Sequence, residues 1–162
     1  MNYEFNQFNS QTHGQLTFDQ ACEKFLEYVG YEPNMEYELI IGTDSLLHSD
    51  HKAEFVSAIV IHRKRSGGIY FWSKRHETNM FSLRQRMFQE ALLSLRLAEQ
   101  VINKLREKNI PEFNMSIHVD IGPNGETKKM VNEIVGMIKG SGFNVKTKPE
   151  SYGASSVADR HT

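Results

Sequence analysis

The sequence predicts an α/β protein built on one mixed sheet. Two observations support this prediction: three strand-like segments with short connections come first, and later strand-like segments alternate with helical ones. Short connections favour antiparallel pairing, whereas strands joined through helices form right-handed parallel crossovers. We therefore expect three antiparallel strands followed by parallel strands with crossover helices, and a helix ahead of them all.

The bulk composition fits one compact domain. The chain has 162 residues, of which 39% are hydrophobic, with a formal net charge of -1 and one cysteine. A near-zero charge gives no global attraction for nucleic acid, although local basic patches can supply one. The single thiol cannot form an internal disulfide, and we see no signal peptide and no apolar run of membrane-spanning length. We expect a cytoplasmic protein that has no membrane partner.

The N-terminal part is predicted to be an extension, residues 1–37, ahead of a domain that spans residues 38–162. Residues 1–15 are rich in Asn and Gln, and we expect them to be irregular. Thr17 and Gln20 have the spacing of a capping box. Apolar residues then recur at helical intervals over about three turns, which predicts a short amphipathic helix.

The domain begins with strands and continues with alternating elements. The predicted strands 38–45, 54–62 and 68–73 are rich in β-branched and aromatic residues, and a Gly-containing turn joins the last two. Ser82 has the properties of an N-cap for the longest helix, which carries one apolar stripe to about Lys108. The remaining predictions are a strand over 115–121, a helix over 126–139, a strand over 143–148 and helical turns within 152–161.

Acidic residues fall at corresponding ends of these elements. If the strand 38–45 runs upward, the long helix begins at the top and descends, and the strand 115–121 also points upward. Asp44 and Asp120 then share the upper end. The helix offers Glu90 at about 12 Å below its start or Glu99 at about 26 Å. Depth favours Glu90, which we choose, whereas the helical wheel places Glu99 nearer the middle of the apolar stripe.

Carboxylates gathered at one end of a sheet have a chemical use. They repel one another unless a cation neutralises them. Magnesium and manganese prefer oxygen ligands, and two such ions roughly 4 Å apart can clamp the attacking and leaving oxygens of a phosphodiester. The alternative interpretation is that each acid is an ordinary surface charge.

Short motifs around these acids resemble those of the ribonuclease H superfamily. IIGTDS, which contains Asp44, resembles the acidic motif of its first strand, and RMFQEAL, which contains Glu90, resembles its helix glutamate. HVD, which ends in Asp120, resembles its fourth-strand aspartate, and Asp159 resembles the aspartate of its final helix. The longer stretches HVDIGPNGETKKMVNEIVGMIKGSGF and KPESYGASSVADRHT, with FVSAIVIHRK, resemble the bacterial YkuK-like family, which is described as ribonuclease H-like.

The resemblance covers the chain from about Glu38 to the C-terminus. It implies that Asp44, Glu90 and Asp120 are catalytic metal ligands and that Asp159 is a catalytic ligand of a second metal or a proton handler. The cofactor would be Mg²⁺ or Mn²⁺, as two ions. The implied function is a nuclease acting on RNA, DNA or a hybrid; the alternative is an inactive nucleic-acid-binding or scaffold protein.

Basic and aromatic residues near the hairpins suggest a nucleic-acid surface. Trp72 and its neighbours could supply a stacking ring, or they could be core aromatics under a solvated hairpin tip. His161 could act as a general acid or base, or it could belong to a frayed terminus. The predicted contacts to nucleic acid are Arg63, Lys64, Arg65, Lys74, Arg75 and Arg84.

Two further motifs are weaker. The turn 122–129 follows a strand and opens a helix, as a P-loop does, but it lacks the second Gly and the Ser or Thr of that motif. We expect a plain turn, whose helix amides could hold one phosphate. His48, Asp50 and His51 could bind a transition metal, but with no further ligand apparent we expect a polar loop.

Overall fold

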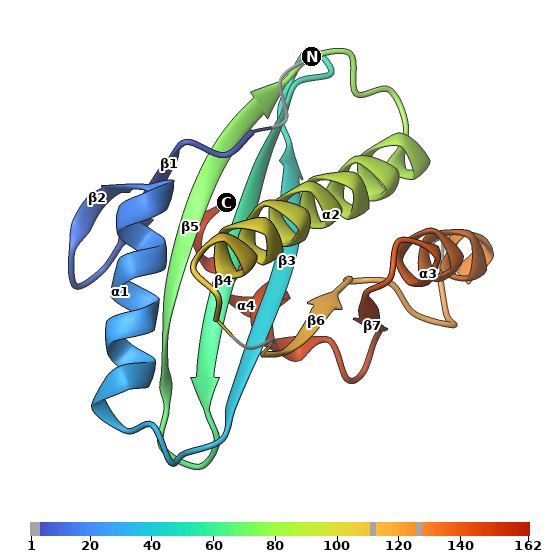
Figure 1. Ribbon diagram of the computed structural model, residues 1–162. Coiled ribbons are helices and arrows are strands. Elements are labelled where there is room, and N and C mark those ends of the chain that lie inside the picture. Colours follow the sequence, from blue (N-terminus) through green and yellow to red (C-terminus); the bar gives the residue numbers. More distant parts are fainter. Residues whose placement is uncertain (1–3, 111–112, 126–127) are drawn as a thin grey trace.

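The computed structural model describes residues 4–110, 113–125 and 128–162, with backbone alone for 152–156. Within these residues, seven strands form one sheet in the order β2-β1-β5-β4-β3-β6-β7 (Figure 1). The elements are β1 (Gln7–Ser10), β2 (Gly14–Thr17), α1 (Phe18–Tyr31), β3 (Tyr37–Leu47), β4 (Ala53–Arg63), β5 (Gly68–Glu77), α2 (Leu83–Glu107), β6 (Asn114–His118), the 3-10 turn η1 (Lys128–Met130), α3 (Val131–Gly140), β7 (Asn144–Lys146) and α4 (Tyr152–His161).

The predicted mixed α/β sheet is confirmed. β3, β4 and β5 form an antiparallel meander. β6 joins β3 in parallel after the crossover through α2, and β7 joins β6 in parallel after α3. These pairings bring the upper ends of β3 and β6 to the same edge of the fold, as the strand directions predict.

The N-terminal segment differs from the sequence prediction. Part of the stretch that was expected to be irregular forms the hairpin β1–β2, and β1 pairs with β5 through Asn9 opposite Trp72. Phe5 and Phe8 are buried in the core. Burial of one such ring contributes about 1.5–3 kcal/mol, which offsets part of the conformational entropy lost when this segment becomes ordered. The sheet therefore extends further at this edge than predicted. The domain boundary at residue 37 stays a prediction.

The helices cover the two faces of the sheet unequally. α1, α2 and α3 pack on one face, where they share an extended core with the odd-numbered residues of β3 and β4, such as Ile41 and Ile59 (Figure 1). On the other face lies α4, above a small cluster formed by Val56, Ala58 and Ala158. The predicted capping box opens α1, because Thr17 and Gln20 exchange both of its hydrogen bonds.

Three element boundaries shift the site residues relative to the prediction. β3 runs on to Leu47, so Asp44 lies inside the strand. β6 ends at His118, so Asp120 lies two residues beyond it. α3 begins later than expected, after η1, and residues 126–127 lie outside the described part of the chain. Along the described residues, no helix combines the length and the apolar content needed to cross a membrane.

Candidate functional site

Strand register brings the first two acids together. β3 and β6 pair in parallel with Gly42 opposite His118. Two residues further along each chain, Asp44 lies beside Asp120, and neighbouring strands are roughly 4.8 Å apart. Because alternate side chains of a strand share a face, Asp44 lies on the face that α4 covers, and Asp120 lies near enough for its charge to raise the pKa of Asp44.

The third acid reaches this pair from α4. Burial raises the pKa of Asp44 to about 6, and the neighbouring charges of Asp159 and Asp120 add to the rise. The carboxyl group of Asp159 lies close enough to that of Asp44 for their direct contact to add to this rise in pKa. Two carboxyl groups in such contact share a proton unless a cation replaces it, because two adjacent anions repel each other.

The fourth acid lies on the opposite side of β3. Ser45 Oγ donates a hydrogen bond of 2.5 Å to Glu90 Oε1, and the Glu90 side chain is only 5% exposed. Burial raises the pKa of Glu90 to about 8, and the charges of Asp44 and Asp120 also raise it, against the hydrogen bond from Ser45. Glu90 is therefore mostly protonated at neutral pH when no cation is bound.

A buried chain of hydroxyls fixes α2 against β3. Ser94 Oγ donates to Thr43 Oγ1 at 2.9 Å, and Thr43 lies 2.8 Å from Ser57 Oγ. Four helix residues rise about 6 Å and two strand residues about 6.6 Å. The contact between Ser94 and Thr43 therefore sets the neighbouring contact between Glu90 and Ser45.

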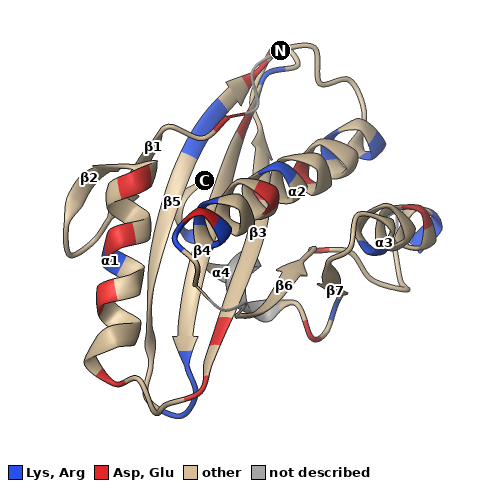
Figure 2. Ribbon diagram, viewed as in Figure 1, with Lys and Arg blue, Asp and Glu red and all other residues tan. Residues whose placement is uncertain are grey.

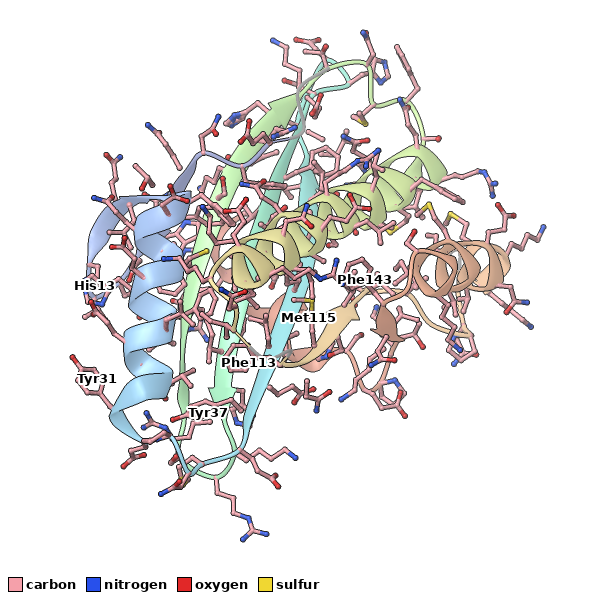
Figure 3. All side chains as sticks on the ribbon, viewed as in Figure 1. His13, Tyr31, Tyr37, Phe113, Met115 and Phe143 are labelled. Carbon is pink, nitrogen blue, oxygen red and sulfur yellow. The ribbon has the colours of Figure 1, made fainter. Side chains whose placement is uncertain are left out.

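The same geometry separates Glu90 from Glu99. Glu99 forms an ion pair of 3.2 Å with Arg96. It lines a pocket of about 550 Å³ between α2, β6 and the turn after α3, where Phe113 and Phe143 also lie (Figure 3). Glu90 thus lies against Ser45, as its depth along the helix predicts. Glu99 lies in the pocket, although the helical wheel places it nearer the middle of the apolar stripe.

The four carboxylates influence one another without closing on a common point. Among the residues that the structure describes, no group of three or more His, Cys, Asp and Glu side chains is arranged to hold a metal ion. The alternation of β3 explains this, because Asp44 faces α4 whereas Ser45, which binds Glu90, faces α2. A shared ion would require Glu90 to leave Ser45 and turn around the end of the strand.

A lysine accompanies Asp120. Lys148 Nζ lies 3.2 Å from Asp120 Oδ1, and the backbone N–H of Lys148 donates to the carbonyl of Ile121 at 2.8 Å. Gly122 makes this approach possible, because a Cβ atom there would lie 3.0 Å from Cβ of Lys148. Sequence reasoning missed Lys148; the signal was the parallel pairing of the strand 143–148 with the strand that leads to Asp120.

His118 is a second residue that sequence reasoning missed as a site neighbour. It is 3% exposed, and neither ring nitrogen has a hydrogen-bond partner in the described part of the chain. Burial, followed by the charge of Lys146, lowers the pKa of His118 to about 4. The imidazole below Asp120 is therefore neutral at physiological pH.

Three of the predicted nucleic-acid contacts lie far from the acids. Arg63 pairs with Tyr37 across the sheet, seven residues before Asp44, which is roughly 23 Å along β3. Arg63 also forms an ion pair of 3.1 Å with Glu32, and Lys64 forms one of 2.9 Å with Glu36. Arg65 follows in the same turn, at the lower end of β4 and β5 (Figure 2).

The other three predicted contacts lie nearer the upper end. Lys74 shares the level and the face of Asp44, because Val56 pairs with both, and its Nζ lies 3.6 Å from Glu54. Arg75 points to the opposite face, over the ring of Phe5. Arg84 binds Glu133 of α3. Lys74 is therefore the one predicted basic contact on the same face as Asp44.

The side chains of Trp72 and His161 pack against each other. Their rings stack at 3.7 Å with an interplanar angle of 7°, and His161 Nε2 lies 3.3 Å from the Tyr70 hydroxyl. The terminal histidine is therefore held against the sheet, and the Trp72 face that it covers is closed to a nucleobase. Phe71 points to the other face and is buried in the core.

The two weaker motifs give no site among the described residues. Gly125 takes a left-handed conformation in the turn after Asp120, and the helix α3 that follows has no side-chain N-cap. The loop that contains His48, Asp50 and His51 connects β3 to β4, and the His51 ring lies against Phe81.

Comparison with known proteins agrees with this architecture. The family described as "Ribonuclease H-like" matches residues 20–162. A relative from Bacillus subtilis (strain 168), "Uncharacterized protein YkuK", is 30% identical, with 96% of each chain covered. A domain of this type suggests a function related to nucleic acid.

Proposed function

Because the chain belongs to the ribonuclease H-like family, we propose that it is a divalent-metal-dependent nuclease that hydrolyses phosphodiester bonds in RNA, DNA or a hybrid. The observation that supports this proposal most is the gathering of the partly buried Asp44 and the buried Glu90 at one end of the sheet, where the pKa of each is raised. Buried acids that repel each other cost stability, and a divalent cation would remove that cost.

The donor set fits a hard cation. The side chains concerned offer carboxylate oxygens only, which is the chemistry that Mg²⁺ and Mn²⁺ prefer. We propose Asp44, Asp120 and Glu90 as ligands, with Asp159 as a ligand of a second ion or a proton handler. When bound, the ions would supply an activated water and charge for the leaving oxygen.

The protein's own residues would assist around this centre. Lys148 neutralises the charge of Asp120 in the structure. With a metal ion on that carboxylate, the Lys148 ammonium would contact a phosphate instead. Lys74, at the same level of the sheet on the other side of Asp44, would contact the neighbouring phosphate. In the absence of a metal ion, the hydrogen bond from Ser45 would keep the Glu90 side chain in place.

Two observations favour a second candidate, an inactive nucleic-acid-binding protein that keeps the fold. Lys148 already neutralises Asp120, and the described acids do not form a ready-made ion cage. In that case the basic residues near the site would bind nucleic acid without hydrolysis.

A cleavage assay separates the two candidates. Purified protein is incubated with labelled single strands, duplexes and hybrids in Mn²⁺ or Mg²⁺, next to the variants Asp44→Asn and Glu99→Gln. The nuclease proposal expects cleavage by the wild type and by Glu99→Gln, and a loss on the order of 10³-fold in Asp44→Asn. Glu99 is the matched control because it lies on the same helix as Glu90 but points into the lower pocket.

Each result has one interpretation. Binding without cleavage by the folded wild type supports the inactive binding protein. Equal cleavage by the wild type and Asp44→Asn indicates a contaminating nuclease and contradicts the proposal.

A further inference from the structure

We infer that the stack of His161 on Trp72 is a latch that holds α4 on the sheet and thereby positions the carboxyl group of Asp159 beside Asp44. Both residues are positioning residues, since neither lies among the four acids. The functional consequence of the latch rests on the proposed function, because Asp159 is one of the proposed ligands. The placement of Asp159 can be measured without any metal or substrate.

The helix straddles β4. Ala158 is fully buried against Val56 and Ala58 of that strand. Successive residues of a helix turn by about 100°, so Asp159 projects to one side of Ala158 and His161 to the other. One side meets Asp44 on β3, and the other meets Trp72 on β5.

Anchoring on both sides fixes the rotation of the helix. With Ala158 as the only pivot, α4 could roll on the sheet and carry Asp159 away from Asp44. The stack opposes this roll, because any rotation that lifts Asp159 also slides the His161 ring off the indole. Aromatic pairs of this kind contribute about 0.5–1.5 kcal/mol beyond the area that they bury.

The stack adds to the contacts that α4 makes with β3 and β4. The described apolar side chains of α4 beside Ala158 are limited to Val157. A helix of ten residues is not stable by itself in water, so its position depends on what it packs against. The hydrogen bond between Tyr70 and His161 Nε2 adds a directional contact to the stack.

Two measurements follow the latch. The chain contains one tryptophan, so quenching of its fluorescence by acrylamide reports the exposure of Trp72. The rate of disulfide formation between cysteines introduced by Asp44→Cys and Asp159→Cys, in a chain that also carries Cys22→Ala, reports how closely α4 holds position 159 to β3.

The variants are His161→Ala, which removes the ring, His161→Phe, which keeps a ring that can stack, and Arg160→Ala, which changes an exposed residue of the same turn. We expect His161→Ala to increase quenching of Trp72 and to slow disulfide formation by up to about tenfold, the fold-change that corresponds to the loss of one aromatic pair. His161→Phe and Arg160→Ala should stay within about twofold of the parent.

The latch is wrong if His161→Ala forms the disulfide as fast as the parent, or if Arg160→Ala slows it equally. Should His161→Ala lose its fold by circular dichroism, Trp72→Ala removes the same contact from the strand and is followed through the disulfide rate alone. Failure of the nuclease assay with a positive latch result rejects the proposed function only, whereas cleavage with an unchanged disulfide rate rejects the latch only.

Discussion

The two faces of β3 hold their acids in different ways. On the α2 face, Glu90 is fixed by Ser45 within a buried chain of hydroxyls. On the α4 face, Asp159 approaches Asp44 from a helix that packs on the sheet through Val157 and Ala158 and through the stack of His161 on Trp72. The difference indicates that metal binding by Glu90 would require the loss of a proton and of a hydrogen bond. Metal binding by Asp159 would depend instead on the position of its helix.

The largest effect should come from neutralising one acid on each face. If the proposed function holds, Glu90→Gln and Asp159→Asn should each reduce Mn²⁺-dependent cleavage by 10²-fold or more, on the scale of losing a metal ligand. Isothermal titration with Mn²⁺ gives the number of bound ions for each variant. Full activity in either variant would remove that face from the site.

The next effect distinguishes the faces through pH. Glu90 is protonated in the folded protein up to a pKa of about 8 but ionised in the unfolded chain above its ordinary value. The folded state therefore binds more protons, and metal-free stability falls as pH rises until it passes this pKa. Between pH 6.5 and 9 the wild type should lose about 2 kcal/mol that Glu90→Gln does not lose.

Urea unfolding in the presence of a chelator measures this difference. Glu99→Gln is the control, because it removes a carboxyl group of the same helix that lies in the pocket beside Phe113 and leaves in place Asp44, whose charge raises the pKa of Glu90. Parallel pH profiles of the wild type and Glu90→Gln would contradict the protonated state of Glu90.

A smaller effect concerns the hydroxyl chain alone. Ser94→Ala removes the donor to Thr43, which keeps its contact with Ser57. We expect a loss of about 1 kcal/mol in the free energy of unfolding, typical of one internal hydrogen bond. Chemical denaturation checks this value, and Ser141→Ala, on the exposed end of α3, is the control. An unchanged stability would mean that packing alone sets the position of α2.

The smallest effect concerns the lysine that competes for Asp120. Lys148→Ala should tighten Mn²⁺ binding about threefold at low salt, because the exposed ion pair is worth less than about 1 kcal/mol. Lys146→Ala removes the same charge from a lysine that pairs with Glu38 and not with Asp120, and it should change the affinity less. Weaker binding in Lys148→Ala would show that the lysine organises Asp120 for the ion.

Strand order and family motifs were sufficient to predict the mixed sheet and the adjacency of Asp44 and Asp120. The choice between Glu90 and Glu99 depended on depth, because the wheel places Glu99 nearer the middle of the apolar stripe. Glu90 and Ser94 are in fact buried polar residues that bond to hydroxyls on β3. Such pairings depend on two elements at once, so the periodicity of one helix cannot reveal them.

The features that the sequence did not reveal arise from contacts that are distant in sequence. Phe5 and Phe8 order the N-terminal hairpin only because a core already exists for them. Arg63 was grouped with Lys74 by composition, although β4 and β5 carry them to opposite ends of the sheet. Trp72 finds its partner in His161, 89 positions later in the numbering of the chain, which no local pattern encodes.

The lack of a side chain at Gly122 affects the ion pair between Lys148 and Asp120. Since a Cβ atom there would lie 3.0 Å from Cβ of Lys148, an added side chain would displace Lys148 by a few tenths of an ångström. The ammonium would shift with it and its ion pair with Asp120 would weaken without any change to an ionisable group. A single methyl group, added where no side chain now exists, would thus act on the electrostatics of the site through sterics alone.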